Sequence, residues 1–189
     1  ENKFPAAHED ALATYRWLTT KASSVNGDPK RLALAGESAG GNLAVATAIA
    51  AQKAGLTAAK HVLAVYPVAQ SNTDTESYLK YADAIPLNRP MMLWFIAQAT
   101  TSPMDSKDPR IDLVHADLKG LPPVTLINAE IDPLRDDGAQ LEQALRNAGV
   151  SVERRLYSGV THEFFGTAAV VQKAQEAQVY AGQRLKADL

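Results

Sequence analysis

The six residues Gly36-Glu37-Ser38-Ala39-Gly40-Gly41 place a serine between two glycines, after a short apolar run and before an alanine-rich one. The pattern Gly-x-Ser-x-Gly is typical of a strand that turns sharply into a helix and exposes the serine hydroxyl at the turn. Glycine on either side of the serine removes Cβ atoms that would clash there. We therefore interpret Ser38 as a nucleophile, and the first-turn N–H of Ala39 as an oxyanion donor.

The residues around this motif predict the strand and the helix that such a nucleophile needs. Residues 31–35 form a short apolar run followed by Gly36, which indicates a strand. Residues 39–54 are mostly small or apolar helix formers and are followed by Gly55, which indicates a buried helix. A Gly/Ser turn that only begins a helix would show the same local pattern, so the rest of the chain must decide.

The rest of the chain alternates strand-like runs with helical patterns. Two near-continuous apolar runs and one more polar run predict further strands, at residues 61–67, 124–129 and 150–157. The more polar run suits a sheet edge. Helical periodicity predicts helices at residues 4–24, 134–147 and 167–189. This alternation predicts an α/β fold with a mostly parallel sheet in three layers and right-handed crossovers.

Residues 68–123 break the alternation. The stretch is too long for an ordinary connection and contains a predicted helix of its own at residues 88–99. We predict a cap-like insertion within one domain of residues 1–189. Four apolar side chains of its helix are candidates for lining an acyl or alcohol pocket, with ordinary core packing as an equal alternative: Met91, Met92, Trp94 and Phe95.

Composition limits the possible partners. The chain has 189 residues, of which 46% are hydrophobic and 21% charged, as expected for one globular domain. With a net charge of −2 and no Lys/Arg run, we expect no nucleic-acid partner. No apolar stretch approaches the length of a membrane span. The absence of cysteine rules out disulfides and a thiol nucleophile, and leaves the compartment undetermined.

A serine nucleophile needs a base, and the base needs an orienting acid. For a nucleophile at such a turn, these partners follow the serine in the order acid, then histidine, each in a loop after a later strand. Asp132 follows the predicted strand 124–129, and His162 lies in a glycine-flanked loop before the last helix. We interpret them as acid and base. Asp132 also suits a helix N-cap, and Glu130 is its nearest rival as the acid.

The other candidate residues are interpreted as structural. Asp136 and Asp137 are expected to stabilise the first turn of the following helix. The pair His162-Glu163 predicts no zinc site, because Gly166 stands where the second histidine of His-Glu-x-x-His would be. The remaining histidines are interpreted as structural or solvated: His8, His61 and His115.

Three blocks of the sequence resemble the hormone-sensitive-lipase-like branch of α/β-hydrolase esterases: residues 36–41, 132–138 and 162–165. The resemblance covers essentially the whole chain. It implies hydrolysis of small carboxylic esters without a cofactor or metal, with Ser38 as nucleophile, His162 as general acid and base, and Asp132 as the orienting acid. It also implies that Glu37 is a supporting hydrogen-bonding residue.

The sequence departs from that family in one segment. The family has a His-Gly-Gly-Gly-type segment upstream of the nucleophile, and the residues before Ser38 contain none. The resemblance thus implies a C-terminal part of the fold, with an incomplete N-terminal half of the sheet and Ala39 as its one oxyanion donor. The strand at residues 31–35 would then be an apolar edge, which we expect to pair with a second copy or a complementing fragment.

Two other functions stay open from the sequence. The same fold and nucleophile also suit an amidase or peptidase. A remnant of a hydrolase that binds a partner while its triad stays idle is the alternative outside enzymes. The missing oxyanion segment favours the non-catalytic alternative for this chain alone. The presence of all three triad residues favours an enzyme for the parent chain.

Overall fold

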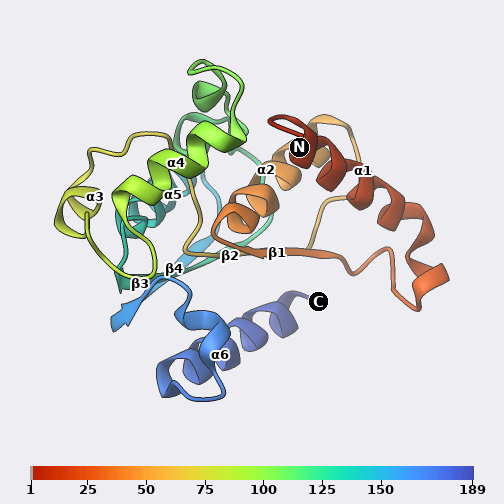
Figure 1. The fold of residues 1–189 in the computed structure, drawn as a ribbon. Helices are drawn as coiled ribbons and strands as arrows, with labels where there is room; N and C mark the ends of the chain where they lie inside the picture. Colours follow the sequence, from red (N-terminus) through yellow and green to blue (C-terminus); the bar gives the residue numbers. More distant parts are fainter. Residues whose placement is uncertain (1) are drawn as a thin grey trace.

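The structure, a computed structural model that describes residues 2–189, is built on a four-stranded parallel sheet (Figure 1). Its strands lie side by side in chain order: β1 (Ala33–Glu37), β2 (His61–Val65), β3 (Val124–Ile131) and β4 (Val152–Thr161). Every neighbouring pair is parallel, so each connection crosses back along the sheet. The predicted α/β fold with a parallel sheet is confirmed.

Helices cover both faces of the sheet (Figure 1). On one side lie α1 (Ala6–Lys21), α2 (Ala39–Lys53), α3 (Glu76–Lys80), α4 (Arg89–Ala99) and α5 (Arg135–Asn147). On the other side lies α6 (Gln172–Asp188). Short 3-10 turns complete the fold at Ala22–Val25, Asp105–Lys107, Leu113–His115 and Phe164–Thr167. None of these helices, within residues 2–189, has the length and apolar character needed to cross a membrane.

The two central strands have buried side chains on both faces. Successive side chains of a strand point to opposite faces, so each strand contributes to two cores. One core joins alternate residues of β2 and β3 to α2 and α5, through Val62, Ala64, Val124 and Leu126. The other core lies on the opposite face and joins β2 and β3 to α6, through Leu63, Val65, Ile127 and Ala129. Coverage of both faces explains the near-continuous apolar runs of these strands.

Two strands extend further toward their carboxyl ends than their apolar pattern predicts. β1 continues through Gly36 and Glu37, which pair in register with Ala64 and Val65. Gly36 therefore lies within the strand and does not end it, which the expected range of 31–35 missed. β4 runs to Thr161, beyond the expected end at residue 157, and its pairing with β3 shifts register there.

The helix boundaries in the structure agree best with those expected from the sequence where a side chain caps the helix. The Asn88 side chain accepts a hydrogen bond from the Met91 N–H at 2.9 Å and begins α4 one residue after the expected start. α1 is shorter than expected, because its last predicted turn is a 3-10 turn. α6 begins at Gln172 and not at residue 167, because Phe164–Thr167 forms a separate 3-10 turn.

The segment of residues 68–123 contains α3 and α4 and packs beside α5. Tyr78, Leu87 and Met92 of this segment form a buried cluster with Leu134, which directly precedes α5. Leu134 is fully buried. The segment is therefore held next to the loop that leaves the carboxyl end of β3.

Candidate active site

Three predicted site residues directly follow three strands of the sheet. Ser38 follows β1, Asp132 follows β3, and His162 follows β4. The carboxyl ends of parallel strands lie at one edge of a sheet, where α/β folds place their ligand sites. The structure therefore brings together side chains that are 30 positions (Asp132 and His162) and 124 positions (Ser38 and His162) apart in the sequence.

The three side chains form a continuous chain of polar contacts. His162 Nδ1 lies 2.8 Å from Asp132 Oδ2, and His162 Nε2 lies 3.1 Å from Ser38 Oγ. Asp132 is fully buried and His162 is 3% exposed. Both distances are within the reach of a hydrogen bond, which is the arrangement in which a base can activate a hydroxyl nucleophile.

Asp132 uses both of its carboxylate oxygens. Oδ1 accepts a hydrogen bond from the Leu134 N–H at 2.9 Å, while Oδ2 faces the imidazole. The helix N-cap weighed for Asp132 from the sequence is wrong, because the N-cap position of α5 is Leu134. Asp132 instead stabilises the turn before α5 with one oxygen and faces His162 with the other. Glu130, the rival acid, accepts a hydrogen bond from the Gly159 N–H at 2.7 Å instead.

Ser38 sits in the strained backbone conformation that the motif predicts. Its φ is 55° and its ψ −119°, in a region that residues with a side chain rarely adopt. At Gly36 a Cβ would lie 2.2 Å from the Gly40 carbonyl oxygen, so this position requires glycine. At Gly40 a Cβ would meet nothing within 4 Å. The steric explanation offered from the sequence therefore holds at Gly36 and is wrong at Gly40, because only Gly36 faces the returning helix.

Ala39 is the first residue of α2, next to Ser38. The first N–H groups of a helix have no partner within the helix. Within residues 2–189, the Ala39 N–H donates no backbone hydrogen bond, and the residue is exposed. A backbone donor beside the serine hydroxyl thus faces outward from the helix end.

Tyr66, which directly follows β2, contacts His162 and was missed by the sequence reasoning. Its ring centroid lies 4.3 Å from that of His162. Its hydroxyl donates a hydrogen bond to Glu37 Oε2, the supporting residue expected from the sequence. Burial raises the pKa of the Tyr66 hydroxyl, and the Glu37 carboxylate raises it further. Its position at the carboxyl end of an apolar strand was the one available signal.

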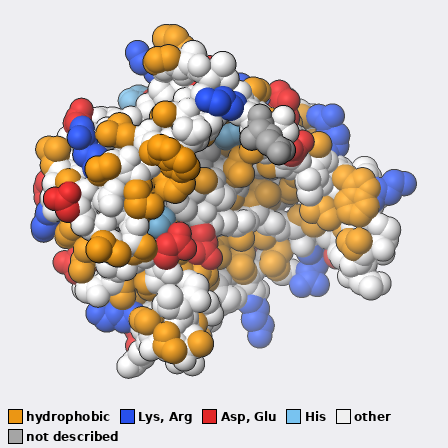
Figure 2. Space-filling model, viewed as in Figure 1, with side chains coloured by type: hydrophobic (Ala, Val, Ile, Leu, Met, Phe, Trp, Pro, Cys, Tyr) orange, Lys and Arg blue, Asp and Glu red, His pale blue; other side chains and the backbone are white. Residues whose placement is uncertain are grey.

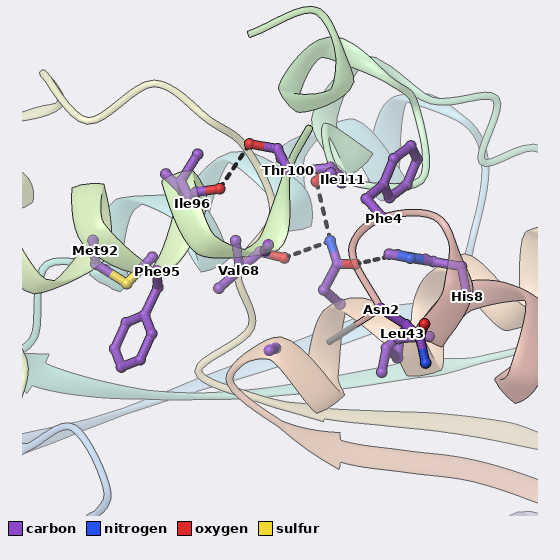
Figure 3. Close-up of a pocket in the computed structure, with 14 residues that line it drawn as sticks. Asn2, Phe4, His8, Leu43, Val68, Met92, Phe95, Ile96, Thr100 and Ile111 are labelled. Atoms are coloured by element: carbon purple, nitrogen blue, oxygen red, sulfur yellow. Dashed lines mark hydrogen bonds between the residues drawn. The ribbon is translucent and has the colours of Figure 1, made fainter. Parts of the chain in front are cut away.

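An apolar cavity of about 230 Å³ lies beside Ala39 (Figure 3). Met92 and Phe95 of α4 line it, and Figure 3 shows Phe4 and His8 on the opposite side. The other two predicted pocket residues are not in the lining. Met91 and Trp94 are 38% and 59% exposed, because residues three and four apart share a helix face and these two belong to the outer one.

Asn42 joins four segments at this cavity. Its Nδ2 donates to the carbonyl oxygens of Val68 and Ile111, each at 3.0 Å, and its Oδ1 lies 3.1 Å from His8 Nε2 (Figure 3). The residue is buried, with all three contacts to chain segments far apart in the sequence. Asn42 therefore holds the first turn of α2 to α1 and to two distant parts of the segment of residues 68–123, at Val68 and at Ile111.

The two aspartates lie in the first turn of α5, as expected, and make further contacts there. Asp137 is fully buried, and its Oδ2 accepts a hydrogen bond from the Ala69 N–H at 2.9 Å. Burial raises the pKa of this carboxyl group. Asp136 accepts a hydrogen bond from the Ser77 N–H at 2.8 Å. Both carboxylates thus bind the segment of residues 68–123 to α5, which periodicity alone does not reveal.

The remaining histidines lie outside the triad. His61 is fully buried at the start of β2, between Asp188 Oδ2 at 2.6 Å and Thr125 Oγ1 at 2.9 Å. Burial lowers its pKa. His115 is largely exposed and lies 2.9 Å from the Asp112 carboxylate. Neither residue contacts Ser38 or Asp132.

Comparison with known proteins identifies the family. The profile of the alpha/beta hydrolase fold family matches residues 1–166. The chain is 34% identical over 190 residues to an ethyl acetate hydrolase of Pseudomonas putida, covering 99% of this chain and 59% of that protein. It is 36% identical over 181 residues to the carboxylesterase NlhH of Mycobacterium tuberculosis, covering 94% of this chain and 57% of that protein.

Solved structures agree with this assignment. The hyperthermophilic esterase of the archaeon Pyrobaculum calidifontis superposes with a TM-score of 0.95 at 35% identity, covering 98% of this chain and 60% of that one. The chain belongs to the alpha/beta hydrolase fold family, in the hormone-sensitive-lipase-like branch whose motifs it resembles. It spans slightly less than two thirds of the length of these relatives.

Proposed function

We propose that this chain carries the catalytic residues of a serine carboxylic ester hydrolase. The observation that carries the proposal is the chain of contacts from Asp132 through His162 to the Ser38 hydroxyl. The Ala39 N–H and the apolar cavity beside it provide places for an oxyanion and for an apolar substituent. The relatives named as an ethyl acetate hydrolase and a carboxylesterase support the same class of reaction.

In the first half of the proposed reaction, Ser38 forms an acyl-enzyme. Its Oγ attacks the ester carbonyl carbon while His162 Nε2 takes the hydroxyl proton. Asp132 stabilises the imidazolium through Nδ1–H, and the Ala39 N–H donates to the oxyanion. Collapse of the tetrahedral intermediate breaks the bond to the alkoxy oxygen, which takes the proton from Nε2 and leaves as the alcohol.

In the second half, water restores the enzyme. His162 Nε2 takes a proton from the water as its oxygen attacks the acyl carbon on Ser38 Oγ. The new intermediate collapses, the bond to Ser38 breaks, and the serine oxygen regains its proton from Nε2. The products are the carboxylic acid and the free enzyme, so the chain's own residues complete the proton transfers.

The cavity beside Ala39 suits the apolar acyl or alcohol group of a small ester. Its volume of about 230 Å³ and its lining by Met92 and Phe95 favour short aliphatic groups over charged ones. The flexible Met92 side chain, only 3% exposed, allows the cavity to adapt to different groups. We therefore propose small, uncharged esters as substrates.

A matched pair of substrates tests this proposal against the amidase alternative. The chain is incubated with p-nitrophenyl butyrate and with the anilide of the same acid, and p-nitrophenol or p-nitroaniline is measured. We expect release of p-nitrophenol above the Ser38→Ala background and none of the aniline. Comparable turnover of the anilide would assign the site to amide hydrolysis instead.

We also propose that the free edge of β1 pairs with the same edge of a second copy. β1 is hydrogen-bonded only to β2 among the strands within residues 2–189, and Ala35 on it is exposed. Figure 2 shows hydrophobic side chains gathered in the hollow of this face, over β1 and α2. An antiparallel pairing centred on Leu34 would set Arg31 of one copy opposite Glu37 of the other, so the charges are complementary.

Light scattering tests the edge pairing. We expect a dimer for the unchanged chain at high concentration and a monomer for Ala35→Lys, because a lysine on an edge strand opposes pairing. Lys60→Ala, an exposed position outside β1, is the matched control and should leave the dimer intact. A monomer for the unchanged chain at high concentration would contradict the proposal.

A further inference from the structure

We infer that Tyr66 is a positioning residue for His162, and that its side chain links the serine turn to the histidine loop. The inference rests on the proposed function, because it concerns the same triad. Tyr66 directly follows β2, the strand between those that carry Ser38 and Asp132. It is fully buried and lies at the edge of the sheet that carries the triad.

The ring of Tyr66 supports one side of the imidazole. The two ring centroids are 4.3 Å apart with an angle of 48° between the planes. The Tyr66 ring also contacts Phe164, with centroids 6.0 Å apart, in the 3-10 turn after His162. Hydrogen bonds at Nδ1 and Nε2 fix the imidazole in its own plane, and the contact with Tyr66 limits its motion out of that plane.

The Tyr66 side chain joins the serine turn to the histidine loop, whose relative position sets the contact between Ser38 and His162. Its hydroxyl donates to Glu37 Oε2, the residue directly before Ser38. The ring of the same side chain contacts His162 and Phe164 on the other segment. One side chain thus contacts the neighbours of the nucleophile and of the base. Loss of the hydroxyl should therefore make the distance between Ser38 Oγ and His162 Nε2 more variable.

Backbone strain gives independent support. Within residues 2–189, four residues other than glycine have a positive φ, and one of them, Asn26, only ends a 3-10 turn. The other three are Ser38 at 55°, Tyr66 at 34° and Glu163 at 67°. All three lie directly after a strand or beside the histidine at the site. Strained residues persist where the surrounding structure requires them, often at active sites, so Tyr66 shares the pattern of the triad loops.

The experiment compares Tyr66→Phe, which keeps the ring, with Tyr66→Leu, which removes it. We expect kcat for p-nitrophenyl butyrate to fall about tenfold in Tyr66→Phe and further in Tyr66→Leu, with KM nearly unchanged, because small misplacements of a base are costly. Tyr157→Phe is the matched control, since Tyr157 is buried and contacts Phe164 with centroids 5.5 Å apart. Its kcat should equal that of the unchanged chain.

A second readout separates this inference from the proposed function. The proton NMR signal of His162 Nδ1–H, held by Asp132, can be followed without any substrate. We expect it to move or broaden in both Tyr66 variants and to stay unchanged in Tyr157→Phe. If the unchanged chain hydrolyses no ester, the proposed function fails while this signal still decides the role of Tyr66. An unchanged signal in a folded Tyr66→Leu, or an unchanged kcat in both Tyr66 variants of an active chain, would overturn the inference.

Discussion

Ser38→Ala is expected to lower ester hydrolysis by about 10⁴-fold or more. The substitution removes the only atom that forms the covalent bond to the acyl group, while His162 and Asp132 keep their own contact at 2.8 Å. The loss should therefore be complete in kcat, with no change in folding. The measurement is the hydrolysis rate of p-nitrophenyl butyrate, with circular dichroism to show that the variant is folded.

A partly buried serine outside the triad provides the control for this prediction. Ser106 lies in a 3-10 turn, and its hydroxyl donates to the Pro103 carbonyl oxygen. Ser106→Ala should retain full activity. A Ser38→Ala variant that keeps the activity of the unchanged chain would assign the reaction to another residue.

Asp132→Asn is expected to lower kcat by about 10⁴-fold. The substitution leaves the shape of the side chain unchanged, but it favours the imidazole tautomer that carries its proton on Nε2 and not on Nδ1. The Asn amide oxygen can still accept the hydrogen bond of the Leu134 N–H, which Asp132 Oδ1 accepts at 2.9 Å. The NH₂ group then faces His162 Nδ1, so the imidazole carries its proton on Nε2. In that tautomer, Nε2 cannot take the proton of Ser38.

Glu130→Gln is the matched control, because Glu130 was the rival acid and lies two residues away. Its carboxylate bonds the Gly159 N–H, and the amide oxygen of Gln can accept the same bond. We expect kcat within about twofold of the unchanged chain, since the change leaves the triad intact. The reverse result, a large loss in Glu130→Gln and none in Asp132→Asn, would exchange the roles of the two acids.

The sequence predicted the parts of the fold that local patterns encode. The apolar runs at residues 61–67 and 124–129 indicated buried parallel strands, and both are central in the sheet. The order of Ser38, Asp132 and His162 along the chain placed each after a strand, and the structure brings them into contact. The strand ends that differed depend on pairing with distant residues. Gly36 looks like a strand end, but it pairs with Ala64 on β2.

The contacts that no local pattern encodes were the ones missed. Tyr66 reaches His162 only because β2 lies between β1 and β3 in the sheet. Asn42 looks like any polar residue in a helix until the fold places Val68 and Ile111 beside it. Asp137 has the position of a first-turn carboxylate but is buried under the segment of residues 68–123. In each case, the role depends on a partner more than 25 positions away.

Reaction with a fluorophosphonate probe tests the central claim most directly, because the probe labels serines activated by a neighbouring base. The unchanged chain is incubated with the probe, digested and analysed by mass spectrometry. The account predicts one label per chain, on Ser38, and none in Ser38→Ala or His162→Ala. Absence of label on Ser38 in the folded, unchanged chain would contradict the account, because it would show that the contacts at 2.8 and 3.1 Å do not activate the serine.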